Sequence, residues 1–84
     1  MYTVYILKSL SDGEHYVGFS SDIDKRLKQH NNGEVRSTKA RRPFVLVYTE
    51  IFSTRIEARR REKYLKSYKG AGEKTSILKN CQIV

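Results

Sequence analysis

The sequence contains one cysteine, Cys81, so no disulfide can form within its 84 residues. It lacks an apolar run of the ~18–20 residues that cross a membrane. It also lacks the basic and then apolar leader of a secreted protein. These absences predict one small domain in the reducing cytoplasm, with no membrane partner. The hydrophobic fraction of 38% still predicts a folded core.

Acidic residues are scarce: nine face 17 lysines and arginines, for a net charge of +8 at pH 7. Such an excess attracts polyanions. The basic residues gather in one predicted loop and one predicted helix, which favours nucleic acid over a merely solubilising surface. No strongly amphipathic apolar face accompanies the basic helix, so a membrane surface has little support. The cluster comprises Arg36, Lys39, Arg41, Arg42, Arg55, Arg59, Arg60, Arg61, Lys63, Lys66 and Lys69.

Three segments have the composition of strands. Residues 2–8 and 15–19 are rich in β-branched and aromatic types, and the turn dipeptide Asp12-Gly13 separates them. They predict an antiparallel hairpin on which the side chains of Tyr5 and Tyr16 converge. Residues 44–52 are the most apolar stretch without clean alternation, which predicts the central strand of the sheet.

Two capping boxes mark helix starts. Ser21, with an acid three residues later, predicts a first helix that ends at residues 31–33. Thr54, with Glu57 three residues later, opens a longer helix to about residue 68 or 69, closed by Gly70. A short helix over residues 73–79 and a tail from Asn80 follow. The domain core is therefore expected at residues 2–69 and a C-terminal segment at 70–84.

The predicted elements carry residue types that can cut a phosphodiester. Hydrolysis needs a deprotonated water, an offset to the phosphate charge and a stabilised leaving oxygen. A tyrosine, with a pKa near ~10, is a poor base unless cations such as Arg26 and His30 lie beside it. Glu62 lies four residues after Ala58 and three before Leu65, so it leans toward the protein body. Its carboxylate suits Mg²⁺.

Each of these residues also has a structural interpretation. Arg26 can pair with Asp22, and Glu62 with Lys66, across one helical turn. His30 can complement the helix dipole as a C-terminal cation. The two tyrosines can be ordinary half-buried strand aromatics. No paired Cys/His spacing, P-loop or Gly-x-Ser-x-Gly motif adds a sharper signal.

Taken together and in order, the motifs resemble those of the GIY-YIG nuclease domain. The resemblance is closest to small single-domain bacterial members related to the N-terminal domain of excinuclease C, and it covers residues 2–69. The motifs are Thr3-Val4-Tyr5, Tyr16-Val17-Gly18, Arg26-x-x-x-His30, the loop 38–43, Leu46-Val47-Tyr48 and the helix with Glu57-Ala58, Arg61-Glu62 and Leu65-Lys66.

The resemblance implies an α+β fold, a small three-stranded antiparallel sheet flanked by helices in the order β-β-α-β-α-(α). By the same resemblance, Tyr16, with Tyr5 close by, would activate the attacking water. Arg26 would bind the scissile phosphate, and His30 would orient the phenol or carry a proton. Glu62 would hold a single Mg²⁺ or Mn²⁺ ion. Nucleic-acid contacts are expected at Gly18, Lys39, Arg41, Arg42, Arg59 and Lys66.

The sequence departs from the family pattern in several places. Thr3-Val4 replaces the Gly-Ile of the first triplet and Val17 is the middle of the second, changes that keep the tyrosines and the strand character. Phe19 stands where several family nucleases have lysine, and residues 70–76 lack an asparagine that many carry there. Two functions therefore stay open: a metal-dependent DNA endonuclease of repair or processing, and a nucleic-acid-binding or adaptor module that keeps the fold without the chemistry. A protein partner that supplies targeting fits either function, and the oligomeric state is open.

Overall fold

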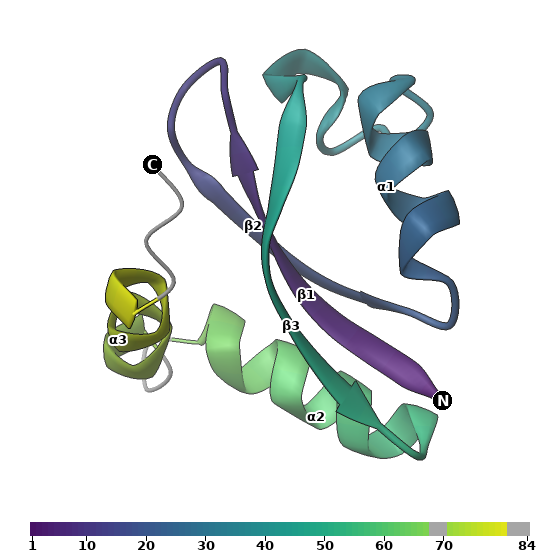
Figure 1. The fold of residues 1–84 in the computed structure, drawn as a ribbon, viewed down its shortest axis with the longest axis vertical. Helices are drawn as coiled ribbons and strands as arrows, with labels where there is room; N and C mark the ends of the chain where they lie inside the picture. Colours follow the sequence, from purple (N-terminus) through teal and green to yellow (C-terminus); the bar gives the residue numbers. More distant parts are fainter. Residues whose placement is uncertain (68–70, 81–84) are drawn as a thin grey trace.

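The computed structural model describes residues 1–67 and 71–80 of the chain (Figure 1). A three-stranded antiparallel sheet has helices on both faces, which confirms the predicted fold and element order. The elements are β1 (Tyr2–Ser9), β2 (His15–Ser20), α1 (Ile23–Asn31), the 3-10 turn η1 (Lys39–Arg41), β3 (Phe44–Phe52), α2 (Arg55–Lys66) and α3 (Ala71–Asn80).

The central strand is β1, because the sheet order is β2-β1-β3. The prediction that residues 44–52 form the central strand is therefore wrong, although the strand bounds are right. Four consecutive β1 residues, 4–7, are buried, as expected for a strand covered on both faces. β3 is an edge strand with one neighbour, and its Ile51 side chain stays 64% exposed. Its apolar run signals half-burial instead of a central position.

Alternate β1 residues face two separate cores. Val4 and Ile6 pack with Ala58 and Leu65 of α2, and Ile77 of α3 packs against the same cluster. On the other face, Tyr5 and Leu7 form a core with Phe44, against which Ile23 and Leu27 of α1 pack. Figure 1 shows α1 on one side of the sheet and α2 and α3 on the other. Within residues 4–7 of β1, the even-numbered side chains therefore face α2 and the odd-numbered ones face α1.

The turns and caps follow the sequence signals with one exception. Gly13 and Gly33 adopt φ values of +76° and +78°, which close the hairpin and end α1. Thr54 caps α2 by accepting a hydrogen bond from the Glu57 N–H, as predicted. The N-cap of α1 is Asp22, whose carboxylate accepts from the Lys25 N–H, and not Ser21. An aspartate one residue further along satisfies the same free N–H groups.

The C-terminal part forms a helix. α2 ends at Lys66 with Ser67 as its cap, and the expected end near residues 68–70 lies outside the described residues. α3 spans Ala71–Asn80, longer than the predicted 73–79, so Asn80 belongs to a helix and not to a tail. Residues 81–84, and with them Cys81, lie outside the described part. No helix within residues 1–67 and 71–80 is long and apolar enough to span a membrane.

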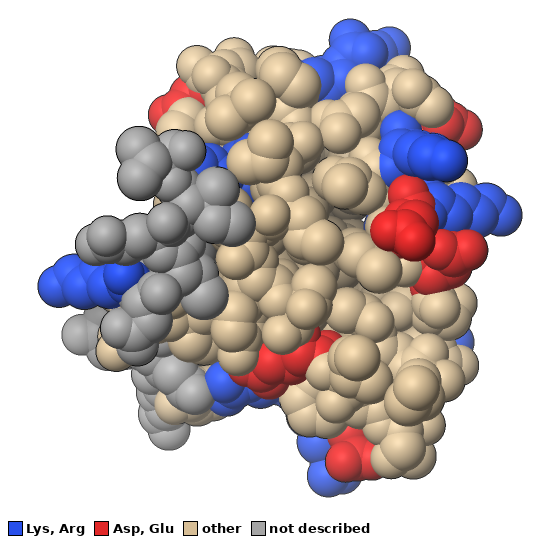
Figure 2. Space-filling model, viewed as in Figure 1, with Lys and Arg blue, Asp and Glu red and all other residues tan. Residues whose placement is uncertain are grey.

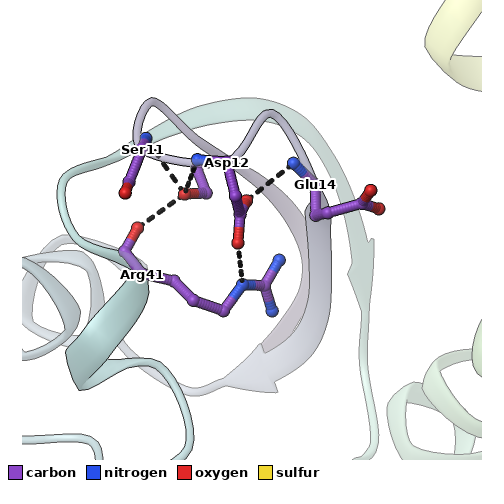
Figure 3. Close-up of polar contacts among 5 residues, drawn as sticks. Ser11, Asp12, Glu14 and Arg41 are labelled. Atoms are coloured by element: carbon purple, nitrogen blue, oxygen red, sulfur yellow. Dashed lines mark hydrogen bonds and ion pairs between the residues drawn. The ribbon is translucent and has the colours of Figure 1, made fainter.

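The β1–β2 turn is tied to η1 by a polar corner (Figure 3). The buried Ser9 hydroxyl donates to the Arg41 carbonyl at 2.6 Å and accepts from the N–H groups of Ser11 and Asp12. The Asp12 carboxylate pairs with Arg41 at 2.9 Å and accepts from the Glu14 N–H. Burial of Ser9 is therefore matched by three hydrogen bonds. This corner holds the loop that follows α1 against the sheet.

Asn31 joins the end of α1 to the start of β3. Its side-chain amide donates to the Phe44 carbonyl at 3.1 Å, and its carbonyl accepts from the Phe44 N–H at 2.7 Å. The same two backbone groups would otherwise lack partners in a part-buried position. The sequence identified Asn31 only as part of a helix stop.

We expect Asn31→Ala to lower the free energy of unfolding by about 1–3 kcal/mol, because it leaves the Phe44 backbone groups without partners. Asn32→Ala is the matched control, since the Asn32 amide contacts only the exposed Glu34 carboxylate at 3.4 Å. Urea unfolding of both variants measures the difference. Equal losses of stability in the two variants would contradict this role of Asn31.

Candidate active site

The two signature tyrosines lie on neighbouring strands, with ring centroids 6.4 Å apart. Tyr5 is 1% exposed, whereas Tyr16 is partly exposed. Tyr5 lies opposite Gly18 in the β1–β2 register, and a Cβ at Gly18 would come within 2.5 Å of the Tyr5 phenol oxygen. Gly18 therefore makes room for the Tyr5 ring. The nucleic-acid contact expected at Gly18 stays a prediction, and the Tyr5 phenol occupies the space that a Cβ would need there.

His30 lies in the middle of a buried hydrogen-bonded chain. Its Nε2 is 3.0 Å from the Tyr5 hydroxyl and its Nδ1 is 2.7 Å from the Thr38 hydroxyl. His30 and Thr38 are both fully buried. The His30 ring also contacts the Tyr16 ring edge-on, with a centroid separation of 5.1 Å. The site thus contains a residue pair, His30 and Thr38, that joins α1 to the following loop.

The hydrogen-bond partners of Thr38 show where the protons lie in the row Tyr5–His30–Thr38. The Thr38 hydroxyl donates to the Val35 carbonyl at 3.3 Å, so its oxygen accepts from His30 Nδ1–H. A neutral imidazole then has its lone pair on Nε2, and the Tyr5 hydroxyl donates to it. In this tautomer Thr38 acts on Tyr5 only through the imidazole.

The His30 imidazole and the Tyr5 phenol are both held in their neutral forms. Burial, together with the positive charge of Arg26, lowers the pKa of His30 to about 4. Burial raises the pKa of Tyr5, although a hydrogen bond from the Arg26 side chain opposes the rise. His30 is therefore not the C-terminal cation of the structural interpretation. A neutral imidazole facing a neutral phenol is the resting state.

Arg26 lies beside the Tyr5 phenol, so α1 supplies both the cation and the histidine of the site. Its Nη1 donates to the Gln29 side chain at 3.2 Å. The alternative pairing with Asp22 is not formed, because the Asp22 carboxylate caps the helix. A guanidinium held next to the tyrosines is suited to a phosphate, since it offers several donors in one plane.

Glu62 brings a carboxylate from α2 to the same place. Its negative charge acts on the Tyr5 phenol, and its side chain is 18% exposed. It also pairs with Lys66 at 3.6 Å, as the structural interpretation expected, and the Lys66 ammonium lies 5.2 Å from the Tyr16 ring centroid. α2 therefore meets the tyrosines with one acid and one base.

The donor set at this place fits a metal ion only in part. Within residues 1–67 and 71–80, no group of three or more His, Cys, Asp or Glu residues could hold a metal ion. Among the described residues, Glu62 is the one carboxylate whose charge acts on the Tyr5 phenol. Mg²⁺ keeps several waters and binds through one or two carboxylates with substrate phosphates, so a single glutamate is compatible with it.

The expected nucleic-acid contacts divide into two groups. Lys66 adjoins Tyr16, and Arg59 is exposed seven residues earlier on α2. Lys39 is exposed in η1, whereas Arg42 donates to the Lys39 carbonyl and Arg41 is bound to the hairpin turn. Figure 2, in which β3 lies in front, shows few charges in the middle of that face, with both basic and acidic residues around its rim.

All five predicted site residues are thus brought together, from β1, β2, α1 and α2, whereas Thr38 was missed. The sequence treated Thr38 only as part of a basic loop. Nothing in its local spacing relates it to His30, because the contact depends on how the loop folds back over α1. The available signal was its place at the start of the 38–43 loop motif.

Comparisons with known proteins identify the family of the chain. The family model described as the GIY-YIG catalytic domain matches residues 1–75. The UPF0213 protein of Staphylococcus saprophyticus is 47% identical over 66 residues, which cover 77% of this chain and 79% of that protein. A UPF0213 protein of Staphylococcus aureus is 46% identical with the same coverage.

A solved structure is similar as well. The solution NMR structure of a UPF0213 protein from Bacillus halodurans has 37% identity and a TM-score of 0.55, covering 92% of this chain and 85% of that one. The chain therefore belongs to the GIY-YIG family, a nuclease-type family. Among its relatives are the small UPF0213 proteins, whose names specify no activity.

The depressed pKa of His30 predicts a pH-dependent stability. Between about pH 6.5 and 4 the unfolded chain binds a proton that the folded state does not, so the free energy of unfolding rises with pH in this window. The contribution is complete above pH 6.5 and is lost as the pH falls to about 4. We expect a loss of up to ~3 kcal/mol, at ~1.4 kcal/mol for each pKa unit.

Urea unfolding at several pH values between 7 and 4.5 measures this loss, with His30→Gln as the comparison. Carboxylates titrate in both proteins, so the difference between the two slopes isolates the imidazole. Parallel pH profiles for the two proteins would show that His30 is not held neutral by the fold.

Proposed function

We propose that the protein is an endonuclease that hydrolyses DNA phosphodiester bonds with the help of a divalent metal ion. The observation that carries the proposal is the meeting of Tyr5, Tyr16, Arg26, His30 and Glu62 at one place. Family membership supports nuclease chemistry, and the net charge of +8 supports a polyanionic substrate.

The two tyrosines take different roles. Tyr16 is the phenol that solvent reaches, so it is the group that, as a phenolate, takes a proton from the attacking water and becomes a neutral phenol. The Lys66 charge beside its ring stabilises the phenolate that this proton transfer requires. Tyr5 is buried and donates to His30, so it fixes the arrangement of rings around Tyr16.

The phosphate and the metal ion have one candidate residue each. Arg26 binds the phosphate through its guanidinium, which lies beside Tyr5. Glu62 would hold a Mg²⁺ or Mn²⁺ ion, with water and phosphate oxygens as the other ligands. When bound, such an ion supplies Lewis-acid stabilisation of the leaving oxygen. Glu62 must then exchange its Lys66 partner for the ion.

A second function is favoured by the Glu62–Lys66 pair. A carboxylate that stays paired with Lys66, in a site with no second acidic ligand among the described residues, binds a metal ion weakly. The protein would then bind nucleic acid without cutting it, as an adaptor. Recruitment by a partner protein and a place in DNA repair or processing belong to either proposal.

We expect Tyr16→Phe and Glu62→Gln to reduce nicking of supercoiled plasmid by roughly a hundredfold or more, because each removes a proton acceptor or metal ligand. Nicking with Mg²⁺, Mn²⁺ or EDTA measures the effect. Tyr64→Phe, at a 42% exposed tyrosine of α2, is the matched control and should cut like the wild type.

Unchanged nicking in both site variants would contradict the proposed site. A wild-type protein that binds DNA in a salt-dependent manner, but nicks it under none of these conditions, would favour the adaptor function.

A further inference from the structure

A polar pocket opens beside Arg26, at the end of the sheet where β1 begins and β2 ends. Its volume is about 680 Å³, and residues of both α1 and α2 line it. This volume lies within the ~300–1,000 Å³ of small-molecule sites. The lining includes Tyr2, Phe19, Asp22, Lys25, Arg26 and Arg55.

The pocket combines positive charge with aromatic surface. Lys25, Arg26 and Arg55 supply three cations, and Asp22 is the one acid that lines it. The Asp22 carboxylate already accepts the Lys25 N–H, so a ligand meets mainly the cations.

Two rings complete the wall, those of Tyr2 and Phe19. Phe19 pairs with Val4 in the β1–β2 register, and Tyr2 lies two residues before Val4, so the two rings are diagonal neighbours on one face of the sheet. Both are packed against the core beneath them and only partly buried. Rings fixed in this way lose little entropy when a planar ligand stacks on them.

The pocket is continuous with the candidate active site through two elements. Arg26 lines the pocket, and its side chain also acts on the Tyr5 phenol. On α2, residues 55, 59, 62 and 66 follow the i, i+4, i+7, i+11 spacing of one helix face. Arg55 of this face lines the pocket, and Lys66 lies over Tyr16. A chain of phosphates lying along this face would therefore connect the two places.

We propose that this pocket receives one unpaired nucleotide of DNA, next to the phosphate that Arg26 binds. A base has planar faces that stack on aromatic rings, and its phosphates are neutralised by lysine and arginine. A paired base has both faces covered by its neighbours in the duplex, so only a nucleotide outside the stack can enter. The substrate is then DNA with a bulge, flap or junction instead of a regular duplex. The inference deepens the proposed nuclease function and depends on it for the position of the phosphate.

Binding measured in EDTA tests the inference without cleavage. Two duplexes of equal length are compared, one fully paired and one with a single bulged 2-aminopurine, whose fluorescence falls when it stacks. We expect the protein to bind the bulged duplex more tightly and to change its fluorescence. Phe19→Leu keeps an apolar side chain but removes the ring, and should weaken binding of the bulged duplex about tenfold, on the order of one lost base–aromatic stack.

Matched lysines provide the charge control. Lys25 lines the pocket, whereas Lys28 lies on the same helix, is exposed and does not line it. Lys25→Ala should reduce the preference for the bulged duplex, and Lys28→Ala should leave that preference unchanged. Circular dichroism of each variant confirms that the fold is retained.

Each alternative outcome is distinct. Equal affinity of the wild type for the two duplexes would overturn the pocket assignment and leave the nuclease proposal standing. The same holds if Phe19→Leu weakens binding of the bulged and the fully paired duplex equally. Binding of neither duplex would overturn the pocket assignment and the nucleic-acid function together. A free deoxynucleoside monophosphate that binds as tightly as the bulged duplex would overturn the inference in favour of a small-molecule site.

Discussion

The buried chain from Tyr5 through His30 to Thr38 is the interaction on which the arrangement of the site depends. It joins the central strand, α1 and the loop after α1 through two hydrogen bonds, of 3.0 and 2.7 Å, among side chains that are at most 1% exposed. Buried polar groups are costly without partners, so the three elements can pack only in an arrangement that keeps the chain intact. Within the described residues, no buried side-chain nitrogen or oxygen lacks a partner.

The same chain separates the two tyrosines into a fixed and an accessible one. Tyr5 is buried, its hydroxyl is bonded to His30, and its ring fills the space beside Gly18 that a Cβ would need. Tyr16 keeps a face toward solvent and has Lys66 beside it. Two similar residues of one motif thus differ in environment because one lies on the central strand and the other on an edge strand. The division of roles in the proposed chemistry follows from that difference.

Much of this fold could be predicted from the sequence, because its signals are local. The hairpin, the Thr54 cap and the bounds of β3 depend on neighbouring residues, and the resemblance to the family supplied the five site residues. The position of β3 was wrong because an apolar run reports burial and not the number of neighbouring strands. Thr38 and Asn31 were missed because their partners, His30 and Phe44, are set by how the loop closes. A glycine is needed at position 18 because the Tyr5 phenol, on the neighbouring strand, leaves no room for a Cβ there.

The most direct test of this account is the protonation of His30, measured from the ¹⁵N chemical shifts of its ring by NMR at pH 7, with His15 as an internal comparison. The account predicts a neutral ring with its proton on Nδ1, unchanged down to about pH 5, since its pKa is lowered to about 4. A doubly protonated ring at pH 7, or a neutral ring protonated on Nε2, would contradict the hydrogen-bonded chain that positions the tyrosines.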